Sequence, residues 1–347
     1  MSRKSVDRPT LGDVARESGV GRMTVSRVVN GGQLVNAATA TRVRAAIKKL
    51  GYQPNEAARM LKGQSSKTIG LIVPDLGDTF FSICAHAVQQ MAAKQGYLTL
   101  LLASERDRDS EVKELAMMMS RNIAGILIVP SSPDSIGRLQ QARTRGVPVV
   151  MLDRTFPGLD AGSVMVENEQ GARKAVHHLL EHGHESILCL GYDSQFNSIG
   201  LRIEGYRKAM TQAGLKPDVF IAESVSGIAP KLVKRLRAPK PPTALFTLNN
   251  VTTIDVLQTL QREAIQVPEN VAIIGFDDFE LATLLTVPLT AVRQPAAELG
   301  RTATHVLLDW IRSRNPEKHP EHPQIVLPTE LIIRRSCGCE IIRRNRA

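Results

Sequence analysis

The chain has 347 residues, of which 43% are hydrophobic and only 4% are aromatic. This composition excludes an intrinsically disordered protein, and the length predicts two or three folded units joined by linkers. The sequence has no apolar run of about 18 residues and no apolar secretion segment after its basic start. We therefore predict a cytoplasmic protein without a membrane span.

Cysteine usage excludes a disulfide scaffold, because the chain contains only four cysteines. They are Cys84, Cys189, Cys337 and Cys339, and none forms the CxxC pair of a structural zinc site. We interpret Cys337 and Cys339 as part of a frayed C-terminal tail, with metal binding as the alternative.

The positive charge is concentrated at the N-terminus. Residues 1–67 carry 13 Lys and Arg against 4 Asp and Glu, a net of +9, whereas the other 280 residues carry only +1. Such a local excess is typical of a nucleic-acid-binding module, since neutralising phosphates releases condensed counterions. The alternative is a solvated basic tail, which would lack apolar periodicity.

Apolar periodicity is present in this basic segment. Thr10 and Asp13 form a capping-box pattern at the start of a helix that Gly19 ends. After a short turn, the pattern predicts a second helix over 22–29 and a third over 40–50. Two short helices joined by a glycine-containing turn predict a helix-turn-helix.

The second helix presents a polar face opposite its valines. That face carries Arg22, Met23, Ser26, Arg27 and Asn30. An arginine there can donate to guanine in the major groove and Met23 can contact a thymine methyl, while Thr24, Ser26 and Asn30 suit phosphates. The alternative is an ordinary solvated helix face.

A short helical segment, residues 54–62, follows the third helix and lies between a proline and Gly63. Two turns are too few for an isolated helix to be stable, so this segment needs a partner to form.

The runs TLGDVARESGVGRMTVSRVVNG and TRVRAAIKKLGYQPNEAARMLKG closely resemble the headpiece of the lactose-repressor (LacI/GalR) family of bacterial transcription regulators. The resemblance implies binding to double-stranded DNA at a pseudo-palindromic operator, with a hinge helix that inserts Leu61 into the minor groove. The alternative for Leu61 is packing on its own domain. The implied DNA-contacting residues are Thr10, Arg22, Met23, Thr24, Ser26, Arg27, Asn30, Arg59, Leu61 and Lys62.

Two features depart from this family pattern. Gly21 stands where the family usually has a serine that caps the recognition helix and touches phosphate. The loop over 30–41 is about two residues longer than usual, a change that surface loops tolerate.

From Lys67 onward, apolar strand patterns alternate with helical ones, beginning with TIGLIVP and resuming at SILCLG. Repeated βαβ units predict an α/β core with two doubly wound parallel sheets. The region resembles periplasmic sugar-binding proteins and the repressor core, which implies two lobes, three crossovers and a cleft. The predicted domains are a headpiece at 1–53, a hinge and linker at 54–67, an effector-binding and dimerisation domain at 68–340, and a basic tail at 341–347.

Polar and aromatic residues follow several predicted strands, where ligands bind in such folds. The predicted effector-binding residues are Asp78, Phe80, Phe81, Asp153, Arg154, Arg202, Asn249, Asp277 and Gln294. Carboxylates accept from hydroxyl groups, Arg and Asn donate to oxygens, and an aromatic face covers a sugar ring. For each residue the alternative is a purely structural role.

Three neighbouring positions qualify this prediction. We interpret Asp278 as a helix cap or a solvated charge. Asp78 replaces the family's usual Asn, and Asn250 replaces an Asp that commonly follows Asn249. The Asp153-Arg154 pair resembles the sugar-binding branch of the family more than the purine-binding branch.

No pattern predicts catalysis or a cofactor, because the sequence lacks a phosphate loop, a GxSxG elbow and an HExxH motif. His178 and His182 lie one helical turn apart and could bind metal, but spacing supplies no third ligand, so we predict no metal site.

We therefore predict a homodimeric transcriptional repressor whose operator binding is controlled by a small sugar or sugar-acid effector acting as inducer. The alternatives are a corepressor-dependent regulator and a periplasmic-type solute-binding protein.

Overall fold

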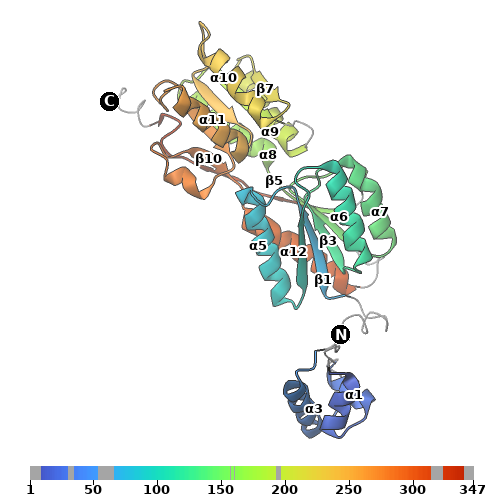
Figure 1. Ribbon diagram of the computed structural model, residues 1–347. Coiled ribbons are helices and arrows are strands. Elements are labelled where there is room, and N and C mark those ends of the chain that lie inside the picture. The colour runs from blue at the N-terminus through green and yellow to red at the C-terminus, as the bar shows by residue number, and fades with distance from the viewer. Residues whose placement is uncertain are drawn as a thin grey trace, which may run out of the picture. The chain divides into compact units, whose positions relative to one another are not determined.

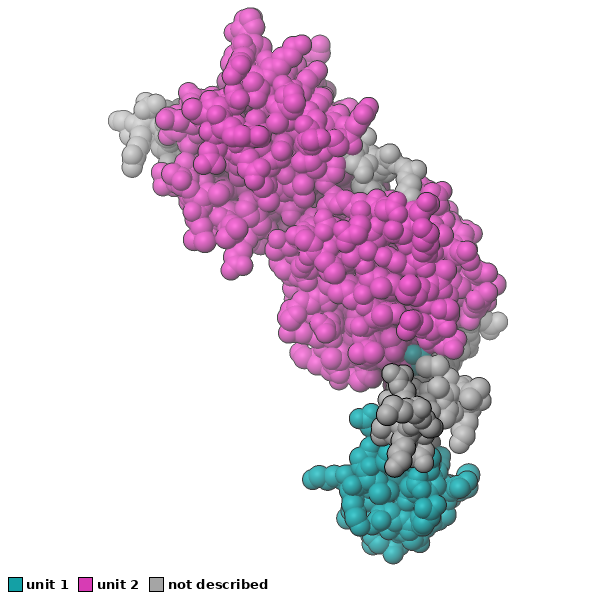
Figure 2. All heavy atoms as spheres, in the orientation of Figure 1, with its two compact units in different colours: residues 1–66 teal, residues 67–347 magenta. Residues whose placement is uncertain are grey.

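The computed structural model describes residues 9–29, 35–53, 66–156, 158–159, 161–192, 197–313 and 323–339. The chain divides into two compact units, residues 1–66 and residues 67–347 (Figures 1 and 2). Among the described residues, no helix combines the length and apolar character that crossing a bilayer requires.

The N-terminal unit is a bundle of three short helices. They are α1 (Leu11–Ser18), α2 (Arg22–Val29) and α3 (Ala37–Leu50). Val14, Val25 and Val43 are fully buried at its centre, so each helix contributes one valine to the core. Helix α3 begins about one turn before the predicted start, because the Asn36 side chain accepts from the amide of Ala38 and caps it.

The C-terminal unit contains two six-stranded sheets, one in each lobe. The first lobe holds β1 (Thr68–Val73), β2 (Leu98–Ala103), β3 (Gly125–Ile128), β4 (Val149–Leu152), β5 (Gly162–Val166) and β11 (Gln324–Leu327), in the order β11-β5-β4-β3-β1-β2. The second holds β6 (Ile187–Tyr192), β7 (Asp218–Ala222), β8 (Ala244–Thr247), β9 (Ala272–Phe276), β10 (Thr290–Arg293) and β12 (Glu330–Ile332), in the order β12-β10-β9-β8-β6-β7. All neighbours pair in parallel except β12, which runs antiparallel to β10.

Helices cover both faces of each sheet, so the inner strands are buried or nearly so and read as continuous apolar runs. The first lobe has α5 (Thr79–Lys94), α6 (Arg108–Ser120), α7 (Ile136–Thr144) and α12 (Ala296–Ser313). The second has α8 (Asn168–Glu181), α9 (Asn197–Gln212), α10 (Ile228–Leu236) and α11 (Asn250–Arg262). Three short 3-10 helices lie in the connections between these elements: η1 (Pro133–Ser135) before α7, η2 (Val225–Gly227) before α10 and η3 (Glu280–Thr283) between β9 and β10.

The chain passes between the lobes three times, as predicted. The crossings follow β5, follow β10 and join β11 to β12. Helix α12 thereby returns to pack on the first sheet, although β10 belongs to the second (Figure 1). The doubly wound architecture with two lobes is confirmed, with one antiparallel edge strand.

The segment after β12 is packed on the second lobe up to the last described residue. The Ser336 hydroxyl donates to the Ile273 carbonyl at 2.7 Å and accepts from the Thr290 amide at 2.8 Å. Cys337 is fully buried and Cys339 is nearly so. Interpreting these two cysteines as a frayed tail was therefore wrong, because hydrogen bonds of this segment to β9 and β10 hold them in the core.

Candidate functional site

Helix α2 presents three side chains that the sequence assigned to base contacts. Helical spacing places Val25 on the inner face of α2, where it is completely buried, and leaves Arg22, Met23 and Arg27 exposed. Met23 is 70% exposed, a high value for an apolar residue in a helix that contributes to a core. The exposed face therefore combines two guanidinium donors with one apolar contact.

Helices α2 and α1 start in different ways. The Gly21 carbonyl accepts from the amides of Thr24 and Val25, so the backbone starts α2 without a capping hydroxyl. Thr10 forms a capping box with Asp13, and its hydroxyl lies 2.7 Å from Oδ2 of Asp13. The amide of Thr10 also donates to that carboxylate at 2.9 Å, which positions the helix start.

Thr24 and Ser26 are half-buried on α2. Four predicted DNA-contacting residues lie outside the described residues: Asn30, Arg59, Leu61 and Lys62.

All nine predicted effector-binding residues line one cavity between the lobes of the C-terminal unit. They are Asp78, Phe80, Phe81, Asp153, Arg154, Arg202, Asn249, Asp277 and Gln294, joined by Arg106, Ser198 and Ile199. The space that they enclose is about 30 Å³. That is room for only about one or two water molecules, so a sugar would require the surrounding side chains or lobes to move.

Asp153 and Asp277 share an unusual backbone conformation. Asp153 directly follows β4 with a φ of 60°, and Asp277 directly follows β9 with a φ of 75°. Left-handed backbone is uncommon outside glycine and concentrates at functional sites. In both lobes it brings a carboxylate from the end of a buried strand into the cavity.

Arg202 is held rigidly by groups on three sides. Its Nε donates to Oδ1 of Asn168 at 2.8 Å, and its Nη1 donates to the Leu248 carbonyl at 2.7 Å. The guanidinium lies 3.8 Å from the centre of the Phe276 ring and 3.6 Å from the Asp277 carboxylate. The side chain is therefore a fixed cation in the second lobe.

The first lobe contributes a second buried pair. Nε of Arg154 lies 3.3 Å from Oδ2 of Asp153, and the guanidinium lies over the Phe81 ring. Within the described part of the chain, Oδ1 of Asp153 has no hydrogen-bond partner. This oxygen is an acceptor available to a hydroxyl group of a ligand.

Two polar contacts join the lobes across the cavity. Nδ2 of Asn250 donates to Oδ1 of Asp78 at 2.8 Å, and the Arg106 guanidinium donates to the Tyr192 hydroxyl. Asp78 and Asn250 are two of the positions where the sequence departs from the pattern of the family that it resembles. They face each other, so this hydrogen bond joins the two departures.

Burial raises the pKa of Asp78, Asp153 and Asp277. The nearby guanidinium groups of Arg154 and Arg202 offset only part of this effect at Asp153. Loss of water disfavours the ionised carboxylate, and a hydroxyl donor from a ligand would favour it again. The cavity is therefore suited to a hydroxyl-rich molecule.

A larger pocket of about 590 Å³ adjoins the cavity. The two share Phe80, Asp277 and Gln294 in their linings. This volume lies in the range of about 300–1,000 Å³ that is typical of small-molecule sites.

Asp278, which follows Asp277, is neither a helix cap nor a solvated charge. Both its oxygens accept from Arg334, at 2.8 and 2.9 Å, and Nη2 of Arg293 donates to it at 2.7 Å. Burial alone would raise the pKa of Asp278, but these two guanidinium groups lower it below its usual value. The earlier interpretation was wrong because Arg334 reaches this position only through the packing of the C-terminal segment.

Sequence reasoning missed four residues of this region: Arg106, Tyr192, Ser198 and Ile199. Arg106 follows β2 and has a φ of 59°, so its position at a strand end was an available signal. Ser198 and Ile199 lie on α9 one turn before Arg202, and helical spacing could have identified them.

The comparisons with known proteins agree with both units. Residues 10–55 match the family of bacterial regulatory proteins, lacI family, and residues 176–337 match the periplasmic binding protein-like domain. The transcriptional repressor PurR of Aliivibrio salmonicida is 32% identical over 91% of this chain and 97% of its own length. The chain belongs to the LacI family.

Two further members of the LacI family illustrate the extent of the similarity. The ribose operon repressor of Escherichia coli K12 is 34% identical over 87% of this chain and 93% of its own length. The structure of the Lac repressor dimer bound to operator and the anti-inducer ONPF has a TM-score of 0.83 and 26% identity, covering 95% of this chain and 99% of that one.

Proposed function

We propose that this LacI-family chain is a transcriptional repressor that binds an operator through α2 and a small sugar or sugar acid in the cavity between its lobes. One observation carries the proposal: all nine predicted effector-binding residues line the same cavity, while a separate unit presents an exposed recognition helix. The names of the PurR repressor and the ribose operon repressor support the regulatory role. Binding to chromosomal DNA would place the protein in the cytoplasm.

The proposed operator contacts divide into two groups. Arg22, Met23 and Arg27 read base edges, since they are the exposed side chains of α2. Phosphates are contacted by Thr10, Thr24, Ser26 and Asn30, with Arg59 and Lys62 as further contacts. Leu61 is the proposed minor-groove wedge.

We propose a homodimer, because the C-terminal unit exposes apolar side chains at a sheet edge and at η3. Leu98 is 69% exposed and Leu101 is 37% exposed on the edge strand β2, and Leu281 and Leu284 are 62% and 77% exposed. Apolar groups of this kind are typical of interaction surfaces. A two-fold dimer also matches a pseudo-palindromic operator.

We favour an effector that acts as an inducer and so releases the operator. A ligand shifts a conformational equilibrium only through different affinities for its states. The cavity has room for only about one or two waters, so a sugar would favour an arrangement in which the side chains around the cavity have moved. The alternative is a corepressor, which requires that the conformation that binds the operator is also the one that binds the effector.

Fluorescence anisotropy of a labelled operator tests this function, with the full chain and a panel of sugars, sugar acids and nucleosides. We expect two chains per operator and release of the DNA by at least one sugar or sugar acid. Tightening of the complex would instead indicate a corepressor. If selection from a random DNA pool yields no fragment that the chain binds more tightly than random DNA, the proposed role is wrong.

Replacing Arg27 by Ala should weaken operator binding by about 1–3 kcal/mol and relax preference at one base pair, if its guanidinium donates to guanine. Anisotropy with single-base operator variants measures both effects. Lys49→Ala is the control, because it removes one charge from α3, where Lys49 pairs with Glu17 at 2.7 Å. Equal weakening of Arg27→Ala on operator and random DNA would assign Arg27 to the phosphates.

Replacing Asn250 by Asp should weaken effector binding roughly ten-fold or more, because like charges at hydrogen-bond distance cost several kcal/mol. The new carboxylate would stand 2.8 Å from that of Asp78. Calorimetry with the effector identified in the panel measures the change. The exchanged double variant Asp78→Asn/Asn250→Asp should recover most of the affinity; if it binds no better than Asn250→Asp, the contact between the lobes does not matter for binding.

A further inference from the structure

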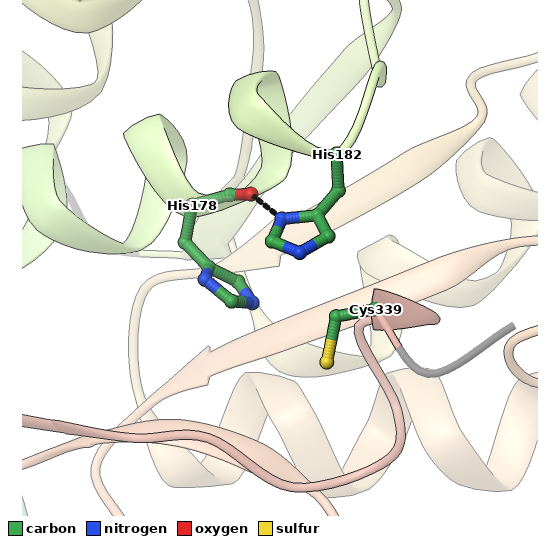
Figure 3. A group of neighbouring side chains, drawn as sticks. All are labelled: His178, His182 and Cys339. Atoms are coloured by element: carbon green, nitrogen blue, oxygen red, sulfur yellow. Dashed lines mark hydrogen bonds between the residues drawn. The ribbon is translucent and has the colours of Figure 1, made fainter. Parts of the chain in front are cut away.

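Two histidines of α8 meet a cysteine from the C-terminal segment. His178 and His182 are one helical turn apart, and their ring centres lie 4.4 Å from each other. Cys339 comes from the segment after β12 and lies against the same side of the helix (Figure 3). The potential ligand atoms of the three residues all lie within 4.8 Å of one another. The tertiary structure thus supplies the third ligand that sequence spacing did not.

The hydrogen bond of His182 determines which ring nitrogen has a lone pair. Nδ1 of His182 lies 2.7 Å from the carbonyl oxygen of His178. A carbonyl oxygen only accepts, so Nδ1 carries the hydrogen and Nε2 keeps its lone pair. Figure 3 shows this second nitrogen directed toward the space between the His178 ring and the Cys339 sulfur. Donation from the other ring nitrogen to a carbonyl is the usual way in which a metal-binding histidine is oriented.

The environment suits a soft ligand set. His178 and Cys339 are 8% and 7% exposed, and the Cys337 sulfur lies 3.3 Å from Nε2 of His178. Bond lengths of about 2.0–2.3 Å place the ligand atoms of one zinc ion roughly 3–4 Å apart, so side-chain shifts on the order of 1 Å would complete the site. Imidazole and thiolate select zinc and similar transition metals over magnesium or calcium.

We propose that His178, His182 and Cys339 bind one Zn²⁺ ion, with Cys337 as the adjacent sulfur. The ion joins α8 to the segment that follows β12 and so fastens that segment, up to Cys339, to the second lobe. None of these residues lines the cavity between the lobes, so the site is distinct from the proposed effector site. An ion that binds only the folded chain stabilises it by mass action.

Titration with Co²⁺ tests this proposal on the full-length reduced chain after removal of metal by a chelator. We expect one equivalent to bind, with a thiolate-to-cobalt charge-transfer band and ligand-field bands of tetrahedral intensity. Zn²⁺ should displace Co²⁺ and raise the melting temperature. A wild-type chain that binds no Co²⁺, or binds it without the thiolate band, overturns the proposal.

Substitutions assign the ligands. His182→Asn and Cys339→Ser should each lower Zn²⁺ affinity at least about ten-fold, since even loss of an outer partner of a ligand costs roughly 10–100-fold. The matched controls His305→Asn, exposed on α12, and Cys84→Ser, buried in the first lobe, should bind like wild type. Circular dichroism checks folding, and the wild-type titration decides the question if a ligand variant does not fold.

A competing donor set is the pair His319 and His322, which lies outside the described residues. Cobalt bound there would give no thiolate band. The double variant His319→Asn/His322→Asn should therefore retain wild-type Zn²⁺ affinity. Loss of binding in that variant, or wild-type affinity in Cys339→Ser, would refute the proposed site.

Discussion

Replacing Asp277 by Asn should abolish most of the effector response while leaving operator binding intact. Asp277 accepts from the Gln294 amide and from the Asn250 backbone amide at 3.3 Å, and it lies 3.6 Å from Arg202. The amide keeps the volume and one acceptor oxygen but loses the charge. A hydrogen bond to a charged group contributes about 1.5–3 kcal/mol, so effector affinity should fall roughly 10- to 150-fold.

Asn is a better test than Ala at this position. Both substitutions remove the carboxylate charge beside the buried Arg202 cation, and breaking a buried pair costs about 3–5 kcal/mol, but Asn keeps an acceptor oxygen in that place whereas Ala leaves none. Loss of the response in Asp277→Ala could then reflect misfolding of the second lobe. Asp277→Asn separates the two effects, because unfolding by urea reports stability and calorimetry reports effector binding.

The control is Asp255→Asn, which makes the same change on α11, away from the cavity lining. It should bind effector and operator like wild type. If Asp277→Asn releases operator at the wild-type effector concentration, then Asp277 does not bind effector and its left-handed backbone is a structural feature only.

Replacing Gly205 by Ala should destabilise the protein and weaken effector binding together. Helices α8 and α9 approach so closely here that an added Cβ would lie 2.2 Å from the Glu169 backbone carbonyl. A backbone atom cannot rotate away, so the helices must separate, and overpacking of this kind typically costs about 1–3 kcal/mol or more. Separation would also displace Arg202 on α9 from Asn168 on α8, a contact of 2.8 Å.

Gly200, five residues earlier on α9, provides the matched control. An added Cβ at Gly200 meets nothing within 4 Å. Gly200→Ala should therefore be neutral or stabilising by up to about 1 kcal/mol, because Ala has the higher helix propensity. Urea unfolding measures both variants. Equal stability of Gly205→Ala and Gly200→Ala would show that the two helices can separate freely.

Local patterns in the sequence predicted the elements and much of the site. The Thr10 capping box and the buried Val25 follow from spacing within one or two helical turns, and both are present. Eight of the nine cavity residues follow from a topological rule, because the carboxyl ends of parallel strands meet at one edge of a sheet, and Arg202 joins them from helix α9. Neither inference required knowledge of which distant segments pack together.

Contacts between distant segments were decided only by the tertiary structure. Arg334 reaches Asp278, and Cys339 reaches His182, because the chain crosses the lobes a third time and lays its last described residues over β9 and β10. The hydrogen bond between Asp78 and Asn250 likewise depends on how the two lobes pack against each other. Sequence periodicity reports the surroundings of a residue within its own element, whereas these pairings depend on the path of the whole chain.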